Sequence, residues 1–190
     1  MVLSGGDGLT RAFVCVVPER GAAEALASFM EGLRRFGGYK WVSADGIHVT
    51  LKFLGDVTAE QIQKLDTSLS RLGGTRPFGV SASGIGFFPS PRRPKVIWLG
   101  VREGVPNLEK LARFVENAAK TAGIPEEKKK FRTHLTLARA RDERDIPAEL
   151  AGELERTPGL SWTCRAFVLM KSVLTPSGPI YTPIREYPLD

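Results

Sequence analysis

The sequence predicts an α+β fold of two duplicated lobes, each with an antiparallel sheet, helices on its outer face and one side of a shared central cleft. Three observations predict it. The order strand, helix, strand, helix, strand occurs twice along the 190 residues. The phrase His-x-Thr-Leu stands in the middle strand of both copies, at 48–51 and 134–137, so that each lobe contributes one motif to the cleft. Hairpin-length connections near the C-terminus indicate antiparallel pairing.

The first copy consists of apolar strands and one-sided helices separated by proline and glycine. Pro18 ends the opening strand, the pair Gly37-Gly38 ends the first helix, and Thr58 is placed to cap the second. The predicted elements are strand 11–17, helix 19–36, short strand 41–42, motif strand 47–54, helix 58–72, and strands 78–83 and 85–88 joined through a bulge.

The second copy follows a proline-rich loop at 89–94. Its first strand is a nearly continuous apolar run (KVIWLGV), and its long helix starts at Pro106 and ends at Gly123. The predicted elements are strand 95–101, helix 106–123, motif strand 131–140, helix 146–154, strand 162–172, a turn at 175–179 and strand 180–184.

The two histidines of the chain both belong to the repeated phrase and lie 86 residues apart. Alternate residues of a strand point to one face, so His48 projects with Thr50, and His134 with Thr136. Two such strands facing each other would surround a small anion with two imidazoles and two hydroxyls. Histidine titrates near neutrality, so the pair could supply one proton donor and one acceptor. The alternative is a pair of half-buried strands with incidental exposed polar residues.

Composition allows a packed domain with an anionic partner. Hydrophobic residues make up 42% of the chain, and the formal charge is +6 with a pI near 9.5. Much of the excess positive charge comes from the clusters at 92–95 and 128–132, and the second cluster runs directly into His134. Such clusters suit a polyanion or are solvated loops. No zinc-ligand cluster, P-loop or dinucleotide fingerprint is present.

The sequence also bears on location. No apolar stretch is long enough to span a membrane, and the polar, glycine-rich residues 1–10 do not resemble a signal peptide. Cys15 and Cys164 lie in apolar runs without metal-ligand spacing, which predicts buried thiols in a reducing compartment. We therefore expect a cytoplasmic protein without a membrane partner.

The phrases HVTLKFLG (48–55) and FRTHLTLAR (131–139) resemble the two signature motifs of the two-histidine (2H) phosphoesterases. The chain is most similar to the branch of RNA 2′,3′-cyclic phosphodiesterases, or LigT-like 2′-5′ RNA ligases. Further blocks, RAFVCVVPE, RPKVIWLGV and SVLTPSGPIYTPI, extend the resemblance over nearly the whole chain. Thr133 departs from it, because this branch commonly has proline before the second histidine.

The resemblance implies a single bilobal domain over 1–190 that uses neither metal nor cofactor. It implies RNA ends with a 2′,3′-cyclic phosphate as substrate, such as tRNA halves or nucleotides, and a 2′-phosphomonoester as product. By the same resemblance His48 is the proton donor and His134 the proton acceptor. Thr50, Thr136 and Arg139 bind the phosphate. Strict alternation places Arg139 on the face opposite His134, so this role requires a bulge or the end of the strand.

Two further residues are candidate substrate contacts. Lys52 shares a face with His48 and Thr50 under strict alternation, so it either reaches the phosphate or points outward. Phe53, like Trp41 and Tyr181, either stacks on a base or packs in the core.

We expect the protein to be a monomer. We also expect its kcat/KM to follow a bell-shaped curve with pH. Three other functions stay open at this point: 2′-5′ RNA ligation of cyclic-phosphate and 5′-hydroxyl ends, hydrolysis of small cyclic nucleotides, and non-catalytic RNA binding.

Overall fold

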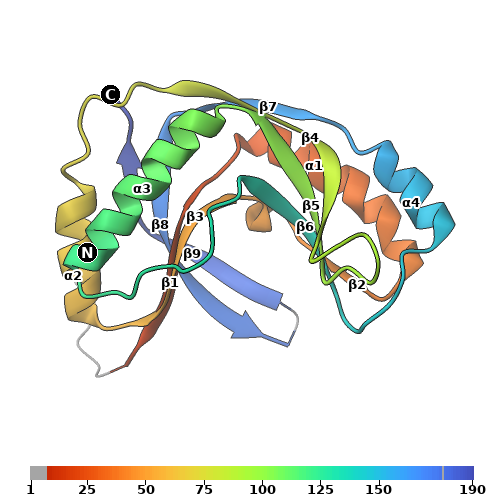
Figure 1. Cartoon of the computed structure of the whole chain (residues 1–190), viewed down its shortest axis with the longest axis horizontal. Helices are drawn as coiled ribbons and strands as arrows, with labels where there is room; N and C mark the ends of the chain where they lie inside the picture. The colour runs from red at the N-terminus through yellow and green to blue at the C-terminus, as the bar shows by residue number, and fades with distance from the viewer. Residues whose placement is uncertain (1–7, 177) are drawn as a thin grey trace.

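The computed structural model describes residues 8–176 and 178–190. Residues 1–7 of the polar N-terminal segment and Ser177 of the predicted turn lie outside this part. Within it, nine strands form a strongly curved sheet in the order β7-β4-β5-β6-β3-β1-β8-β9, with β2 paired to β6 (Figure 1). The strands are β1 (Thr10–Val16), β2 (Tyr39–Trp41), β3 (Val49–Val57), β4 (Phe78–Phe88), β5 (Val96–Glu103), β6 (His134–Ala140), β7 (Leu160–Cys164), β8 (Ala166–Thr175) and β9 (Gly178–Pro188).

The sheet confirms the α+β class and the antiparallel pairing, since every pair of neighbouring strands is antiparallel. The predicted division into two separate sheets is corrected, because β3 and β6 join all the strands into one. They are joined by a single residue pair, Val49 with Leu135, which we call the seam. On one side of the seam lies the β3 half (β3, β1, β8, β9), and on the other the β6 half (β6, β5, β4, β7, with β2).

The predicted strand 162–172 is two strands. β7 pairs with β4 in the β6 half, whereas β8 pairs with β1 in the β3 half, and the chain passes between the halves at Arg165. Arg165 interrupts the apolar residues at this point, but one charged residue does not identify where a strand changes its partner, so the sequence predicts a single strand.

Each half of the sheet is covered by helices from both copies of the sequence. The helices are α1 (Arg20–Leu33), α2 (Ala59–Leu69), α3 (Val105–Thr121) and α4 (Ala148–Glu155). From the first copy, α1 contacts β7 in the β6 half; from the second copy, α3 contacts β3 and α2 in the β3 half (Figure 1). As predicted, Thr58 caps α2, in a reciprocal capping box with Gln61. The halves of the sheet therefore do not coincide with the halves of the sequence.

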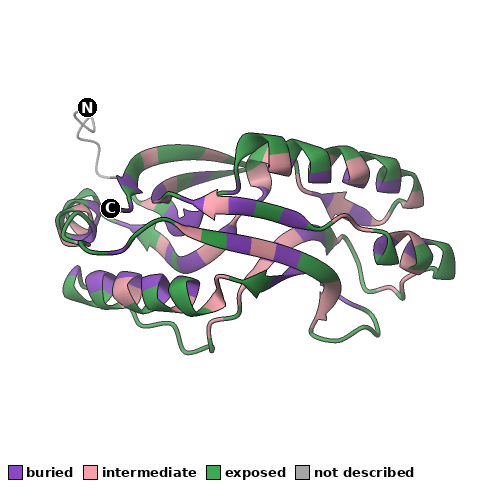
Figure 2. Ribbon diagram, turned by 90° about the horizontal axis from the view of Figure 1, so that it is seen from above, coloured by how far each residue is buried: buried purple, intermediate pink, exposed green. Residues whose placement is uncertain are grey.

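The central strand β1 is buried on both faces. Ala12, Val14 and Val16 belong to the main core beneath the helices, while Phe13 and Cys15 form a separate small cluster on the opposite face. The helices expose one side and bury the other, which produces the alternating colours along each helix in Figure 2. Cys15 and Cys164 are both buried and free, as predicted.

Of the helices described, none combines the length and apolar character needed to cross a membrane.

Candidate active site

Each His-x-Thr-Leu motif contains a β-bulge at its leucine. In β3 the residues on either side of Leu51 oppose consecutive residues of β1, and in β6 the residues on either side of Leu137 oppose consecutive residues of β5. Each leucine is therefore the extra residue of its strand. Beyond a bulge the alternation of faces is inverted.

The bulge in β6 supplies what the phosphate-binding role of Arg139 requires. Leu137 and Ala138 are both fully buried, so the next side chain, Arg139, returns to the face of Thr136 and is exposed there. In β3 the same inversion brings Phe53 to the face of Thr50, where it is 57% exposed.

The expectation that Lys52 faces the site is wrong. The bulge at Leu51 turns Lys52 toward α3, where it is 3% exposed. Its Nζ donates hydrogen bonds to both carboxylate oxygens of Glu116, at 2.8 and 2.9 Å, and to the carbonyl oxygen of Pro125 at 3.0 Å. Lys52 therefore links β3 to α3 on the face of the sheet opposite Thr50.

The seam sets the two motifs against each other. Val49 lies opposite Leu135, both completely buried. On this antiparallel register His48 falls opposite Thr136, and Thr50 opposite His134. His48 is the residue just before β3, and His134 is the first residue of β6. Each histidine thus lies opposite the threonine of the other motif in register. The two motif strands were expected to face each other across a cleft between lobes, but they are neighbours in one sheet.

A cavity of about 590 Å³ lies over this face of the sheet. Its lining includes His48, Thr50, Thr136, Arg139 and Phe53. Counting Arg139, four basic side chains line the cavity: Arg34, Lys40, Arg139 and Arg141. None of the described lining residues is acidic. The tip of the β8–β9 hairpin borders it through Pro176, Pro179 and Tyr181. The cavity is therefore electropositive and suited to a phosphate group.

His48 lies in an aromatic surrounding that makes its neutral form the stable one. Its ring centroid is 4.9 Å from that of Phe13 and 5.4 Å from that of Tyr181. Burial lowers the pKa of His48 to about 4, opposed by a hydrogen bond to the backbone of Gly46 and assisted by the positive charges of Arg139 and His134. Phe13 is the site residue that the sequence did not single out. The unbroken apolar run of β1 was its signal, since it implied burial on both faces.

His134 does not line the cavity but packs edge-on against Phe88, at 5.0 Å, and Trp98, at 6.0 Å. Its Nδ1 lies 2.7 Å from the carbonyl oxygen of Arg132. A carbonyl only accepts hydrogen bonds, so Nδ1 carries the proton and Nε2 of the neutral ring is an acceptor. Burial, and then the charges of Arg139 and Arg132, lower the pKa of His134.

Comparison with known proteins decides the family. The sequence profile of the 2′-5′ RNA ligase superfamily matches residues 22–175. The chain belongs to this superfamily. The resemblance inferred from the two motifs is thereby confirmed.

Relatives in the 2′-5′ RNA ligase superfamily match almost end to end. The RNA 2′,3′-cyclic phosphodiesterase of Archaeoglobus fulgidus is 33% identical over 177 residues, covering 93% of this chain and 99% of its own. That of Methanothermobacter thermautotrophicus is 33% identical over 183 residues, covering 94% and 98%. The crystal structure of TT0787 from Thermus thermophilus superposes with a TM-score of 0.78 at 26% identity, over 94% of this chain and 97% of that one.

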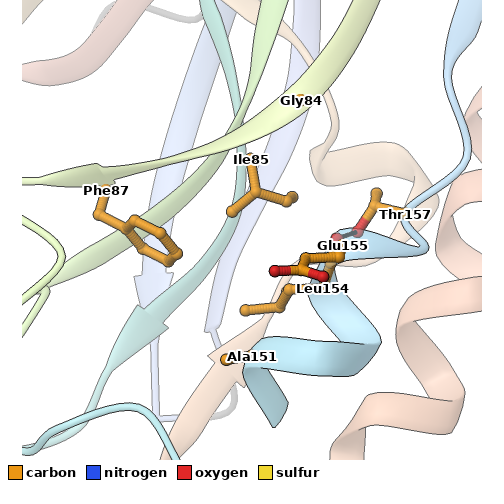
Figure 3. A pocket seen from close by; sticks show the side chains of 7 residues that line it. All are labelled: Gly84, Ile85, Phe87, Ala151, Leu154, Glu155 and Thr157. Atoms are coloured by element: carbon orange, nitrogen blue, oxygen red, sulfur yellow. Dashed lines mark hydrogen bonds between the residues drawn. The ribbon is translucent and has the colours of Figure 1, made fainter. Parts of the chain in front are cut away.

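A second cavity, of about 410 Å³, lies between β4 and α4 (Figure 3). Glu155 is its one titratable lining residue among those described, and none of the superfamily motif residues reaches it. Across residues 8–176 and 178–190, no three His, Cys, Asp or Glu side chains gather as a metal-binding group. The cavity of about 590 Å³ over the seam, which we call the seam cavity, is therefore the candidate active site of this superfamily member.

The low pKa of His48 predicts a loss of stability in acid. Unfolded His48 takes up a proton near pH 6.5 but the folded residue only near pH 4, so the free energy of unfolding falls as the pH drops through this interval. The shift corresponds to at most about 3 kcal/mol. Urea denaturation of the wild type and His48→Gln between pH 7 and 4 measures this, with Thr50→Val as control. Between pH 7 and 4, His48→Gln should lose less stability than the wild type or Thr50→Val. Equal losses in all three proteins would contradict the buried neutral imidazole.

Proposed function

We propose that the protein is an RNA 2′,3′-cyclic phosphodiesterase that opens a terminal cyclic phosphate to a 2′-phosphomonoester. The observation that carries this proposal is the register at the seam, which places His48 opposite Thr136 and Thr50 opposite His134 beside one electropositive cavity that His48 and both threonines line. Nearly full-length similarity to curated enzymes of this activity supports it. The protein acts as a cytoplasmic monomer, with residues 1–190 forming one bilobal domain and taking RNA ends such as tRNA halves.

Binding comes first, and it prepares the histidines. The hydroxyls of Thr50 and Thr136 and the guanidinium of Arg139 bind the non-bridging oxygens of the cyclic phosphate, where negative charge is concentrated in the transition state. The bound anion also raises the pKa of a nearby imidazole, since it stabilises the protonated form. His48, whose pKa is low in the unliganded protein, becomes a usable proton donor only with substrate present.

The chemical step needs two proton transfers. Nε2 of neutral His134 accepts a proton from water as the water oxygen bonds to phosphorus. The bond between phosphorus and the ribose 3′ oxygen breaks, and protonated His48 donates its proton to that oxygen. The phosphate stays on the 2′ oxygen, and exchange with solvent restores both histidines. Each transfer contributes about 10²- to 10⁴-fold to the rate.

The terminal base has an aromatic surface available at the cavity. Phe53 is a lining residue and is 57% exposed, although its ring lies only 6.2 Å from the buried ring of Phe13. An exposed aromatic face beside a nucleotide site can stack on any base. Phe53 therefore holds the terminal base without selecting it.

Product analysis tests the function. An oligonucleotide ending in a 2′,3′-cyclic phosphate is incubated with the protein in EDTA, with and without a second RNA carrying a 5′-hydroxyl. We expect a 2′-phosphate end in both cases. A 3′-phosphate, or a requirement for added metal, would contradict the mechanism. Joined RNA would identify ligation, the activity after which the superfamily is described, with a ribose hydroxyl replacing water at the same residues.

A further inference from the structure

We propose that the seam cavity contains a second phosphate subsite, formed by Arg141 and Lys40, that binds the 5′-phosphate of the terminal nucleotide. That group is either the phosphodiester linking the nucleotide to an RNA chain or a free 5′-phosphate. The inference rests on the proposed function, because it takes the cyclic phosphate to lie between the two motifs. It adds the substrate class, since a bare nucleoside cyclic phosphate leaves the second subsite empty.

The first observation is the order of side chains along the second motif strand. Thr136, Arg139 and Arg141 succeed one another along the chain, and all three line the cavity. The backbone N–H of Arg141 donates to the carbonyl oxygen of Gly38 at 3.0 Å, so the pairing with the β2 side continues past the end of β6. Two residues of extended chain span about 6.6 Å. The backbone positions of Arg139 and Arg141 are thus about as far apart as neighbouring phosphates along a nucleic-acid strand.

The second observation is an unfavourable pair of charges. Lys40 of β2 lies directly opposite Arg139 of β6, and both line the cavity. Like charges directly opposite each other destabilise a sheet. Lys40 Nζ donates only to the carbonyl oxygen of Pro176, at 3.5 Å, within the described part of the chain. A bound anion would remove this repulsion, which otherwise has no compensating contact in that part.

The third observation is the amount of uncompensated charge. Of the four basic lining residues, Arg34 is paired with Glu31. Arg139, Arg141 and Lys40 have no ion pair with any residue that the structure describes. A single cyclic phosphate carries one negative charge. Three free cations therefore exceed what it needs, which leaves Arg141 and Lys40 available to bind a second phosphate.

Three substrates test the subsite: a nucleoside 2′,3′-cyclic phosphate, the same compound with a 5′-phosphate, and a dinucleotide ending in the same cyclic phosphate. The measured quantity is the ratio of kcat/KM for each of the last two to that for the first. A charge-assisted contact to phosphate should raise this ratio roughly 10- to 100-fold in the wild type. Arg141→Ala and Lys40→Ala should each lower it by about 10-fold. Arg76→Ala removes the same charge from an exposed loop outside the cavity and should leave it unchanged.

The two phosphate-bearing substrates distinguish the sources. A gain only with the dinucleotide identifies an RNA phosphodiester as the ligand, and a gain with both identifies any 5′-phosphate; either result supports the subsite. Ratios near one in the wild type, or ratios that survive both alanine substitutions, would overturn it. If the wild type were inactive on all three substrates, the proposed function itself would be contradicted. Failure of the subsite and failure of the proposed function are therefore distinguishable.

Discussion

Replacing His48 or His134 by alanine is expected to lower kcat on a cyclic-phosphate RNA end by about 10²- to 10⁴-fold, with little change in KM. Each imidazole is required only when a proton moves, whereas Thr50, Thr136 and Arg139 hold the phosphate throughout. The two histidines act in one step, so the double variant should be little slower than the slower single variant. Steady-state kinetics on one oligonucleotide measures all three.

The pH dependence of these variants assigns the two roles. A general base fails in acid because it becomes protonated, and a general acid fails in alkali because it loses its proton. His48→Ala should therefore remove the alkaline limb of the bell-shaped profile, and His134→Ala the acid limb. The reverse pattern would exchange donor and acceptor.

Folding must be separated from catalysis in this experiment. Thermal unfolding at pH 7.5 should show both alanine variants folded at the assay temperature, and Lys95→Ala serves as a surface control for the kinetics. A His48→Ala or His134→Ala variant that is folded and fully active would refute acid–base catalysis at the seam.

The second large effect concerns stability. Glu116→Leu is expected to lower the free energy of unfolding by about 3 kcal/mol, because it leaves the Lys52 cation buried without its partner. The side chain of Lys52 is 1% exposed and that of Glu116 27%. Lys52→Met leaves a carboxylate that water can reach, so its cost should be smaller, about 1–2 kcal/mol. Glu116 also accepts a hydrogen bond from the backbone of Glu127, which its loss would release.

Urea denaturation of the two single variants and of Lys52→Met/Glu116→Leu measures the asymmetry. The double variant should be more stable than Glu116→Leu alone, because an apolar pair replaces an unpaired charge. The exposed pair Lys64–Glu60 supplies a control, since breaking an exposed ion pair should cost at most about 1 kcal/mol. Equal losses in the two single variants would contradict the burial of Lys52.

How far the sequence predicts the site is clearest in the two motif strands. The two-residue period places His48 with Thr50 and His134 with Thr136. It fails from the leucines onward, because a bulge depends on how the neighbouring strand is paired. For this reason the period predicts the wrong face for Lys52, and it allows Arg139 to reach the phosphate only through a bulge or the end of the strand. In the second motif a trace is visible, since the consecutive apolar Leu137 and Ala138 do not alternate.

Pairing between distant strands was the other limit. The helices and most strands follow from periodicity and from proline, glycine and capping residues such as Thr58. The change of partner at Arg165, and the single sheet through Val49 and Leu135, depend on long-range packing that no local pattern records. The facing of Lys40 and Arg139 has the same origin, since nearly a hundred positions of the chain separate them.

The passage of the chain between the halves bears on how the molecule unfolds. One residue pair at the seam would be a weak hinge if each half of the sheet were an independent unit. Instead β4 and α1 of the first copy belong to the β6 half, and β8 and α3 of the second copy to the β3 half. The chain therefore passes repeatedly between the halves, and each half contains elements of both copies, which favours a single cooperative transition. Such non-local pairing also slows folding. The relative position of the two histidines is thus secured by the interlacing of the chain rather than by the hydrogen bonds between their strands.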